Sequence, residues 1–232
     1  MSPSVTTPGL VVAMPMLGEW DHCQMVEDAG ASANIELDRG GRPASTSAHA
    51  LAAAAQRLFL RNGFDQTTVE DIAASVGVSR RTFFRYFATK ADVVWVESDT
   101  EMAHFCELLA TAPRFADPVD VVEDAFIAAV DHRGDELEWA RGRAELILYA
   151  PAVQAHANAV YRQWRVVIAD FIAERTGVAA DSDHPRAVAY AVLAASMAGH
   201  ERWLSDPGSD LADCLRAMFA LVIPRGSGST GG

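Results

Sequence analysis

Apolar residues recur every three or four positions along most of this chain, which is the spacing of amphipathic α-helices. The clearest early example lies between residues 47 and 62, where Leu51, Ala55, Leu58 and Phe59 share one face and Gly63 ends the segment. The pattern predicts an all-α protein. After Lys90 it predicts one long helix ending before Pro113, and then helices over residues 118–133, 135–149, 151–175, 184–204 and 209–222.

The most specific pattern lies in residues 67–90, TTVEDIAASVGVSRRTFFRYFATK. Thr67 or Thr68 can cap a first short helix, with Glu70 or Asp71 in the capping-box position. Gly77 accepts the left-handed backbone of a tight turn, and Ser79 can cap a second helix over residues 80–87. Two short helices joined in this way predict a helix-turn-helix.

The second of these helices divides its residues between two faces. Phe83 and Phe87 point toward the expected core, whereas Arg80, Arg81, Phe84 and Arg85 point largely away from it. Guanidinium groups at the start of a helix can donate to guanine O6 and N7 in a major groove. A short amphipathic helix with a solvated basic face is the alternative interpretation.

The distribution of charge favours nucleic-acid binding. The chain carries a net charge of −12, and its only lysine is Lys90. Residues 44–90 hold six cations and three anions, so this segment is +3 and the remainder is −15. A single basic region in an acidic protein is typical of a module that meets phosphate there.

Residues 51–95 resemble the DNA-binding domain of the TetR (tetracycline-repressor-like) family of bacterial transcription regulators. The matching residues are Ala55, Leu58, Phe59, Gly63-Phe64, Thr67-Thr68-Val69, Asp71-Ile72-Ala73, Gly77-Val78-Ser79, Thr82 to Phe87 and Lys90. The run Arg80 to Phe87 and the acidic C-terminal part, with its Trp and Arg residues, also resemble the TetR subgroup associated with mycofactocin gene clusters in actinobacteria.

The resemblance implies specific DNA contacts. Thr68, Thr82, Tyr86 and Lys90 would contact phosphates, and Arg80, Arg81 and Phe84 would lie nearest the base edges. Ser79 and Arg85 complete the candidate set. Arg81 stands where many relatives carry a small residue such as glycine, and Phe84 replaces the commoner tyrosine, so base recognition is expected to differ from that of relatives.

The predicted organisation has four parts: a disordered leader over residues 1–45, a helix-turn-helix domain over 46–92, a ligand-binding and dimerisation domain over 93–223, and a disordered Gly/Ser-rich tail over 224–232. The run Arg39-Gly-Gly-Arg-Pro just before the first helix is either a basic arm for a minor groove or part of a flexible leader.

The larger domain carries bulky residues on several predicted helices. The candidates for contact with a small apolar or amphipathic effector are Phe105, Phe126, Trp139, Tyr149, Trp164 and Met197. Taken singly, each of them is better explained by core packing. Arg141, Arg143, Arg162 and Arg165 could direct an anionic group into a pocket, although a solvated helix face explains them as well.

The last two predicted helices suggest a homodimer. One is rich in small residues and the other carries an apolar stripe, so the candidate interface residues are Ala191, Ala195, Leu211, Leu215, Met218 and Phe219. The alternative is that both stripes face only the core of their own chain.

Other classes of function find little support. Three widely spaced cysteines and scattered histidines match no metal site or disulfide framework, and no cofactor motif or catalytic triad stands out. The sequence has no apolar run long enough to span a membrane, which favours a cytoplasmic protein. We therefore predict a ligand-responsive regulator that binds a double-stranded palindromic operator as a dimer. It is expected to be a repressor that the effector releases from DNA. The alternative is a helical small-molecule-binding protein or enzyme whose helix-turn-helix is only structural.

Overall fold

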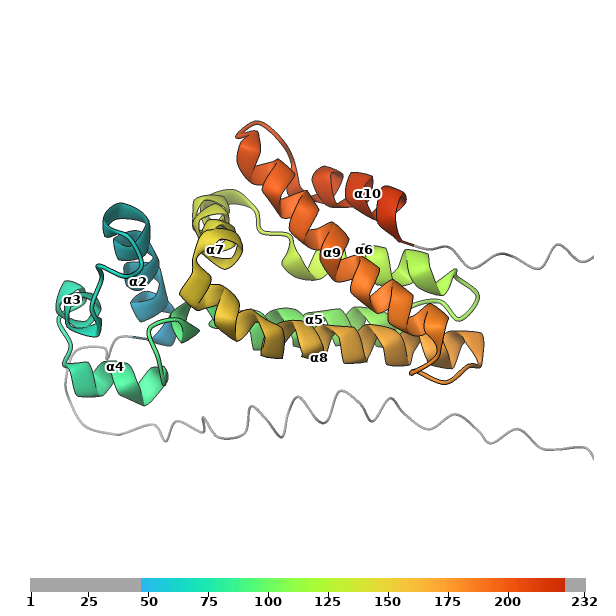
Figure 1. The fold of residues 1–232 in the computed structure, drawn as a ribbon, viewed down its shortest axis with the longest axis horizontal. Helices are drawn as coiled ribbons and strands as arrows, with labels where there is room; N and C mark the ends of the chain where they lie inside the picture. The colour runs from blue at the N-terminus through green and yellow to red at the C-terminus, as the bar shows by residue number, and fades with distance from the viewer. Residues whose placement is uncertain (1–46, 224–232) are drawn as a thin grey trace, which may run out of the picture.

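The computed structural model describes residues 47–223, which form nine α-helices and two short 3-10 helices (Figure 1). In chain order these are α2 (Ala48–Asn62), α3 (Val69–Ser75), α4 (Arg80–Tyr86), the 3-10 helix η3 (Asp92–Trp95), α5 (Ser98–Thr111), α6 (Pro118–Val130), the 3-10 helix η4 (Gly134–Glu136), α7 (Leu137–Tyr149), α8 (Pro151–Thr176), α9 (Asp183–Ser205) and α10 (Leu211–Val222). The predicted all-α class is confirmed. The predicted leader, with its Arg39 to Pro43 run, and the predicted tail lie outside the described residues.

The helices gather in two groups. α2, α3 and α4 form one end of the molecule, and α5 to α10 form the larger part (Figure 1). The smaller group has its own core, in which Leu51, Phe59, Ile72 and Phe83 are almost completely buried. Leu146 of α7 also belongs to that core. The smaller group is therefore packed onto the larger one through α7.

Local sequence signals set the ends of the short helices. Thr68 is the N-cap of α3 and forms a capping box with Asp71: the Thr68 hydroxyl accepts from Asp71 N at 3.1 Å, and Asp71 Oδ2 accepts from Thr68 N at 2.9 Å. Gly77 adopts φ +71° in the turn, as a left-handed position requires. Ser79 then caps α4 by accepting from Thr82 N at 3.1 Å. These details agree with a helix-turn-helix.

The long helix predicted after Lys90 is wrong in its first part. The chain instead forms η3, and α5 begins only at Ser98. Val93 and Val94 are buried, and the Val94 carbonyl accepts from Arg143 Nε of α7 at 2.9 Å. Arg143 belongs to a helix that is distant in sequence. The spacing of apolar residues does not report such a contact, and it therefore does not predict the break between η3 and α5.

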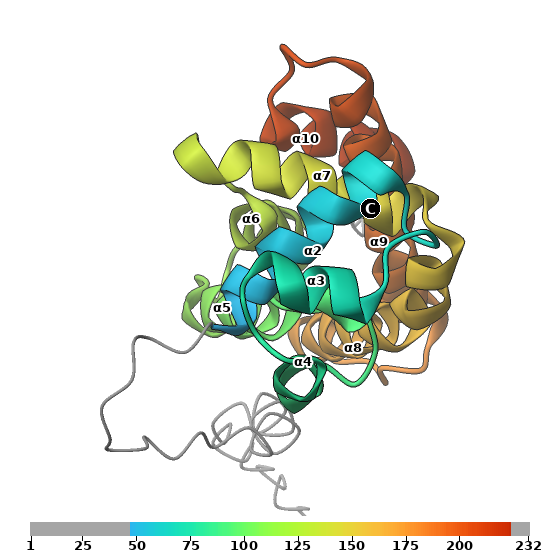
Figure 2. The ribbon, with the colours of Figure 1, turned by 90° about the vertical axis from the view of Figure 1, so that its left-hand side faces the viewer.

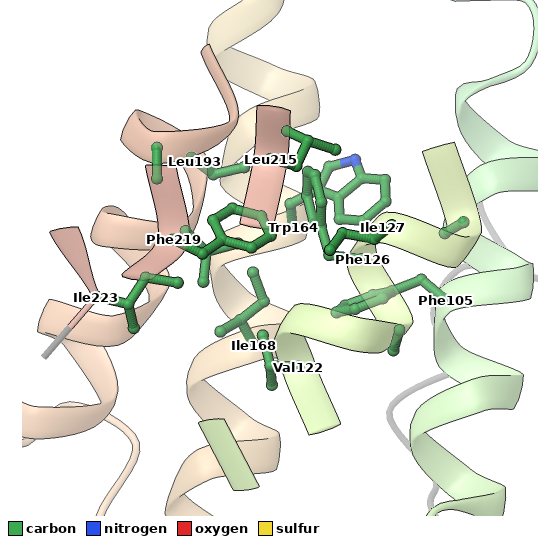
Figure 3. Close-up of a cluster of buried hydrophobic side chains, with 14 of the residues drawn as sticks. Phe105, Val122, Phe126, Ile127, Trp164, Ile168, Leu193, Leu215, Phe219 and Ile223 are labelled. Atoms are coloured by element: carbon green, nitrogen blue, oxygen red, sulfur yellow. The ribbon is translucent and has the colours of Figure 1, made fainter. Parts of the chain in front are cut away.

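The larger group is held by an apolar core between α5, α6, α8, α9 and α10 (Figure 3). Phe126 lies at its centre, with ring centroids 4.9 Å from Trp164, 5.8 Å from Phe219 and 6.2 Å from Phe105. Aromatic pairs at such separations contribute beyond the area they bury. This core forms one wall of the cavity described below.

The two C-terminal helices pack closely against each other. A Cβ atom on Gly199 of α9 would lie 2.8 Å from Leu215 Cδ2 and 3.2 Å from Leu215 Cα, so only glycine allows this approach. Leu215 and Phe219 are fully buried and point into the core of their own chain (Figure 3), and Ala195 and Leu211 are buried as well. The predicted interface stripe therefore needs correction, because these four residues face the protomer's interior. Ala191 and Met218 are partly buried against the same core.

Two further expectations concern the whole chain. Cys106 and Cys214 are buried, whereas Cys23 lies outside the described residues. Among residues 47–223, no helix combines the length and the apolar character needed to cross a bilayer.

Candidate nucleic-acid interface and ligand cavity

The recognition helix α4 has one buried and one exposed face. Phe83 is fully buried and Phe87 is 7% exposed, whereas Arg80, Arg81 and Arg85 are exposed and Phe84 is 43% exposed. Figure 2 looks onto the end of the molecule where α2, α3 and α4 lie. The predicted division of the helix is therefore observed. The Phe84 ring meets the Phe83 ring edge-on, with centroids 5.5 Å apart, and still leaves a large part of its surface exposed.

The three arginines of α4 differ in what they contact. Arg80 Nη1 donates to Glu70 Oε1 of α3 at 2.6 Å, and its guanidinium lies 5.3 Å from the Phe84 ring centroid. Arg85 Nη2 donates to the Tyr86 hydroxyl at 3.1 Å. Arg81 makes no ion pair or hydrogen bond with the residues that the structure describes. Arg81 is therefore the arginine of α4 whose donors are most available to a partner.

The polar residues at the two helix starts already serve as caps. Ser79 Oγ and Thr82 Oγ1 lie 2.9 Å apart, and the Thr68 hydroxyl is 2.6 Å from Asp71 Oδ2. The hydrogen bond from the Thr68 side chain, followed by that from its backbone N–H, lowers the pKa of Asp71. Thr68, Ser79 and Thr82 thus lie at exposed or partly exposed helix starts, where backbone N–H groups favour phosphate.

Lys90 was expected to contact a phosphate, but its side chain is partly engaged within the protein. Its Nζ donates to the Phe64 carbonyl at 2.8 Å and to the Thr67 carbonyl at 3.0 Å, and it lies 4.4 Å from the Phe64 ring centroid. Two of its three donors therefore hold the segment between α2 and α3. One donor remains for an external partner.

The larger group of helices contains a cavity of about 100 Å³. Of the predicted effector contacts, Phe126, Trp164 and Met197 line it, whereas Phe105, Trp139 and Tyr149 do not. Phe105 is fully buried in the core, Tyr149 is 58% exposed at the end of α7, and Trp139 packs its ring against His132 and His49. Arg143, which the sequence offered as a possible partner for an anionic group, also lines the cavity. The remaining lining residues, which the sequence did not single out as effector contacts, are Trp95, Ser98, Glu101, Val130, His132, Ala140, Ala144, Ile147, Leu148, Val160, Tyr161, Leu193, Ser196, His200, Trp203 and Leu211.

A buried ion pair forms part of the cavity wall. Arg143 of α7 forms a two-pronged contact with the Glu101 carboxylate of α5, in which Nη2 lies 2.9 Å from Oε2. His132 Nε2 lies 3.4 Å from Glu101 Oε1. Of the four arginines considered for a pocket, Arg143 is thus the one that lines it, but its charge is already compensated within the protein.

The pKa values of this cluster follow from its geometry. Burial by itself would raise the pKa of Glu101, but the Arg143 guanidinium and then His132 outweigh burial and lower it from 4.5 to about 2. The hydrogen bond to Glu101 raises the pKa of His132 above 6.5 against the opposing effect of burial. Burial lowers the pKa of His200, which also lines the cavity. His200 is therefore neutral at pH 7.

Glu97, Glu101 and His132 bring their oxygen and nitrogen atoms within 4.8 Å of one another, a grouping that could hold a metal ion. Arg143 nevertheless contacts both oxygens of Glu101. Its guanidinium stands where a cation would, and a metal would have to displace it. The arrangement fits an internal ion pair better than a metal centre.

One feature of the sequence does mark the cavity wall. Ser196, His200 and Trp203 follow one another at helical spacing and therefore share a face of α9. By contrast, Glu101, His132 and Arg143 come from separate segments, so only tertiary structure brings them together.

Helix α7 joins the cavity to the DNA-binding end. It supplies Arg143 to the cavity, and the Trp139 carbonyl on the same helix accepts from Gln56 Nε2 of α2 at 2.6 Å. Gly142 lies against Gln56 and Leu60, where a Cβ atom would be 2.6 Å from each of their side chains. Figure 1 shows α7 between α2 and the rest of the larger group. Helix α7 therefore contacts both the cavity and α2.

Comparison with known proteins gives relatives for both parts of the chain. Residues 51–94 match the family model for bacterial regulatory proteins of the tetR family, and residues 116–226 match that of the MftR C-terminal domain. A Mycobacterium tuberculosis protein named as a candidate mycofactocin biosynthesis transcriptional regulator, MftR, is 34% identical over 79% of this chain and 93% of its own length. The HTH-type transcriptional regulator TcmR of Streptomyces glaucescens is 30% identical over 73% of this chain and 77% of its own.

Solved structures show the same fold. SmeT, the repressor of the Stenotrophomonas maltophilia multidrug efflux pump SmeDEF, aligns with a TM-score of 0.53 at 20% identity, over 81% of this chain and 96% of its own. Together with the exposed helix-turn-helix and the MftR-type C-terminal region, these matches show that the chain belongs to the TetR family of bacterial transcription regulators, among those of the mycofactocin-associated kind.

Proposed function

We propose that this protein is a dimeric repressor that binds a palindromic DNA operator and leaves it when a small apolar or amphipathic molecule enters the cavity. The exposed face of α4 carries the proposal, since Arg81 and Phe84 lie at the surface and Arg81 has no partner among the described residues. Membership of a family of DNA-binding regulators, rather than enzymes, supports it. Such a protein would act in the cytoplasm, where the chromosome of a bacterium is found.

The proposed contacts follow from the geometry of the helix-turn-helix. Arg81 and Phe84 would reach the base edges, with Arg80 joining them once it releases Glu70. The groups that would face phosphates are the side chains of Thr68, Ser79, Thr82, Arg85 and Tyr86 and the remaining donor of Lys90. A single short helix contacts few bases, so two copies in successive major grooves, about 34 to 36 Å apart, are needed for useful specificity.

The proposed dimer uses surface that the protomer leaves exposed. On α9, Ala187, Tyr190, Ala194 and Met197 lie on one exposed face, and Leu221 at the end of α10 is 78% exposed. Large exposed apolar side chains grouped on neighbouring helices are typical of an interaction surface. Ala191 and Met218, which are partly buried, would lie at the edge of this interface.

Selection of bound sequences from a random DNA pool tests the proposal with the full chain. We expect enrichment of an inverted repeat whose half-sites are separated by one helical turn. An Arg81→Ala, Phe84→Ala double variant serves as the control and should enrich no such repeat while keeping the helical content of the wild type. Absence of enrichment by the wild-type protein at low salt would contradict the proposal.

A further inference from the structure

Two tryptophans on the cavity wall carry a buried indole N–H that nothing in the described structure satisfies. Trp203 is 1% exposed and its indole Nε1–H has no partner among the described residues. The indole N–H of Trp95, also on the cavity wall, has none either. Donors buried in this way nearly always find an acceptor, because leaving one unpaired sacrifices its hydration. These two groups therefore point to an acceptor supplied from outside the chain.

The charged groups of the same cavity need no such partner. Arg143 donates to the Val94 carbonyl, to Glu101 and to Ser98 Oγ, and Glu101 also pairs with His132. An ionised ligand in this cavity would either remain unpaired or disrupt the pair, and removing one partner of a buried pair strongly destabilises a protein. The cavity therefore favours an uncharged ligand.

His200, which shares a face of α9 with Trp203, adds an acceptor to the cavity wall. Its Nδ1 lies 2.9 Å from the Ser196 carbonyl, and a carbonyl can only accept, so the neutral ring carries its proton on Nδ1. Nε2 is then left with a lone pair. A hydroxyl or N–H of a ligand can donate to it.

The other walls are apolar and largely aromatic. Phe126, Trp164, Val160 and Leu193 line the cavity together with the Tyr161 ring. Flat aromatic walls stack well against a planar ring system. A volume of about 100 Å³ holds several water molecules or a small ring system, so larger ligands require the walls to move.

We propose that the cavity binds a neutral, planar, mainly apolar molecule whose carbonyl oxygens accept hydrogen bonds from the indole N–H groups of Trp203 and Trp95. This inference rests on the proposed function, in which the cavity holds the effector, and it specifies that effector's chemical class. A hydroxyl on the ligand adds a bond to His200 Nε2.

Three probes with the same two-ring skeleton test the chemistry: 1-tetralone, which carries a ketone, tetralin, which carries none, and tetralin-1-carboxylate, which is an anion. Calorimetric titration of the full chain at pH 7 should show 1-tetralone binding about five- to tenfold more tightly than tetralin, the net value of one buried hydrogen bond. The carboxylate should bind more weakly than the ketone. Equal affinity for tetralin and 1-tetralone, or tightest binding of the carboxylate, would overturn the inference.

Indole resonances identify the donors directly. In protein labelled with 15N-tryptophan, 1-tetralone should move the N–H resonances of Trp203 and Trp95 downfield, and tetralin should not. Trp139 is the matched control, because its indole N–H also lacks a described partner but does not line the cavity. The Trp139→Phe variant should keep the preference for the ketone, whereas Trp203→Phe should lose it.

The test does not depend on the folding of one variant. If Trp203→Phe is unfolded, the wild-type resonances and the Trp95→Phe variant still decide the question. If the Trp203 and Trp95 resonances do not move, ordered water satisfies these donors and the inference is wrong. The DNA selection described above is independent: operator binding without a ketone preference overturns only this inference, and a ketone preference without operator binding overturns only the proposed function.

Discussion

Arg80 and Arg81 are neighbours in sequence but differ in their availability to DNA. Arg80 is held by Glu70 at 2.6 Å, whereas Arg81 is exposed without a described partner. An arginine that contacts guanine O6 and N7 contributes to discrimination at one base pair, while one that pairs with a phosphate contributes equally to all sequences.

We therefore expect Arg81→Ala to cost about 1 to 3 kcal/mol at one operator position and to relax selectivity there. Competition binding against a set of single-base operator variants measures this effect. Arg80→Ala is the comparison, and its loss should be smaller because the wild-type side chain must first leave Glu70. A uniform loss across all variants for Arg81→Ala would reassign that residue to a phosphate.

The Glu101, His132 and Arg143 cluster predicts how stability changes with pH. The pKa of Glu101 is lowered to about 2, so its contribution is present above 4.5, the pKa of an ordinary glutamate, and is lost as pH falls toward 2. The pKa of His132 is raised above 6.5, so its contribution is complete below 6.5 and is lost as pH rises through the raised value. The contribution of this cluster to thermal stability should therefore be greatest between about pH 4.5 and 6.5.

Calorimetry as a function of pH checks this expectation. His132→Gln should remove the decline that the wild type shows above pH 6.5 and leave the acid limb in place. Glu101→Gln leaves the Arg143 charge buried without its partner, which typically costs about 3 to 5 kcal/mol. A His132→Gln profile that matches the wild type would mean that His132 does not titrate with the fold.

At the scale of elements, α7 is the structural link between cavity and DNA-binding end. Gly142 is the residue that lets it approach α2, since a Cβ atom there would lie 2.6 Å from Gln56 Nε2 and from Leu60 Cδ1. Gln56 is 5% exposed and its amide is tied to the Trp139 carbonyl, so its side chain has little freedom to move aside.

The direction of the stability change in Gly142→Ala tests this contact. In an open helix interior, replacing glycine by alanine should stabilise by about 1 kcal/mol through helix propensity alone. Here we expect the opposite sign, a loss of about 1 to 3 kcal/mol, because the added methyl overpacks the α2–α7 contact. Urea unfolding measures the difference, and faster amide hydrogen exchange in α2 would locate it. A stabilised variant would show that the two helices separate at little cost.

The comparison of sequence with structure is also clearest at this scale. The helix-turn-helix could be predicted because its determinants are local: Thr68 and Ser79 cap helices three residues away, and Gly77 makes the turn within the same segment. The break between η3 and α5 could not be predicted, because Arg143 binds the Val94 carbonyl from 49 residues away. The hydrogen bonds of Lys90 and the unpaired indole N–H of Trp203 could not be predicted for the same reason. Both depend on how distant segments pack together.

At the scale of the whole molecule, the open question is which faces of α9 and α10 meet a second copy. Leu215 and Phe219 stabilise the protomer, so a charge at Leu215 should unfold the chain instead of producing a folded monomer. The exposed face of α9 carries Tyr190, Ala194 and Met197. Within the chain, Arg165 lies 4.8 Å from the Tyr190 ring centroid and Met197 also borders the cavity, but all three side chains remain exposed in the protomer. This face is the stronger candidate for the interface.

We expect Ala194→Glu to give a folded monomer. Alanine at position 194 is exposed in the protomer, so glutamate costs little there until a second copy covers it, when an unpaired carboxylate becomes buried. Ala110→Glu, an equivalent change at an exposed position of α5, is the matched control and should leave the assembly unchanged. Sedimentation at micromolar concentration should then show a dimer for the wild type and the control but a monomer for Ala194→Glu. That monomer should keep its helical circular dichroism yet bind the operator much more weakly, because the second half-site no longer adds to the first. A dimeric Ala194→Glu protein would move the interface away from this face of α9.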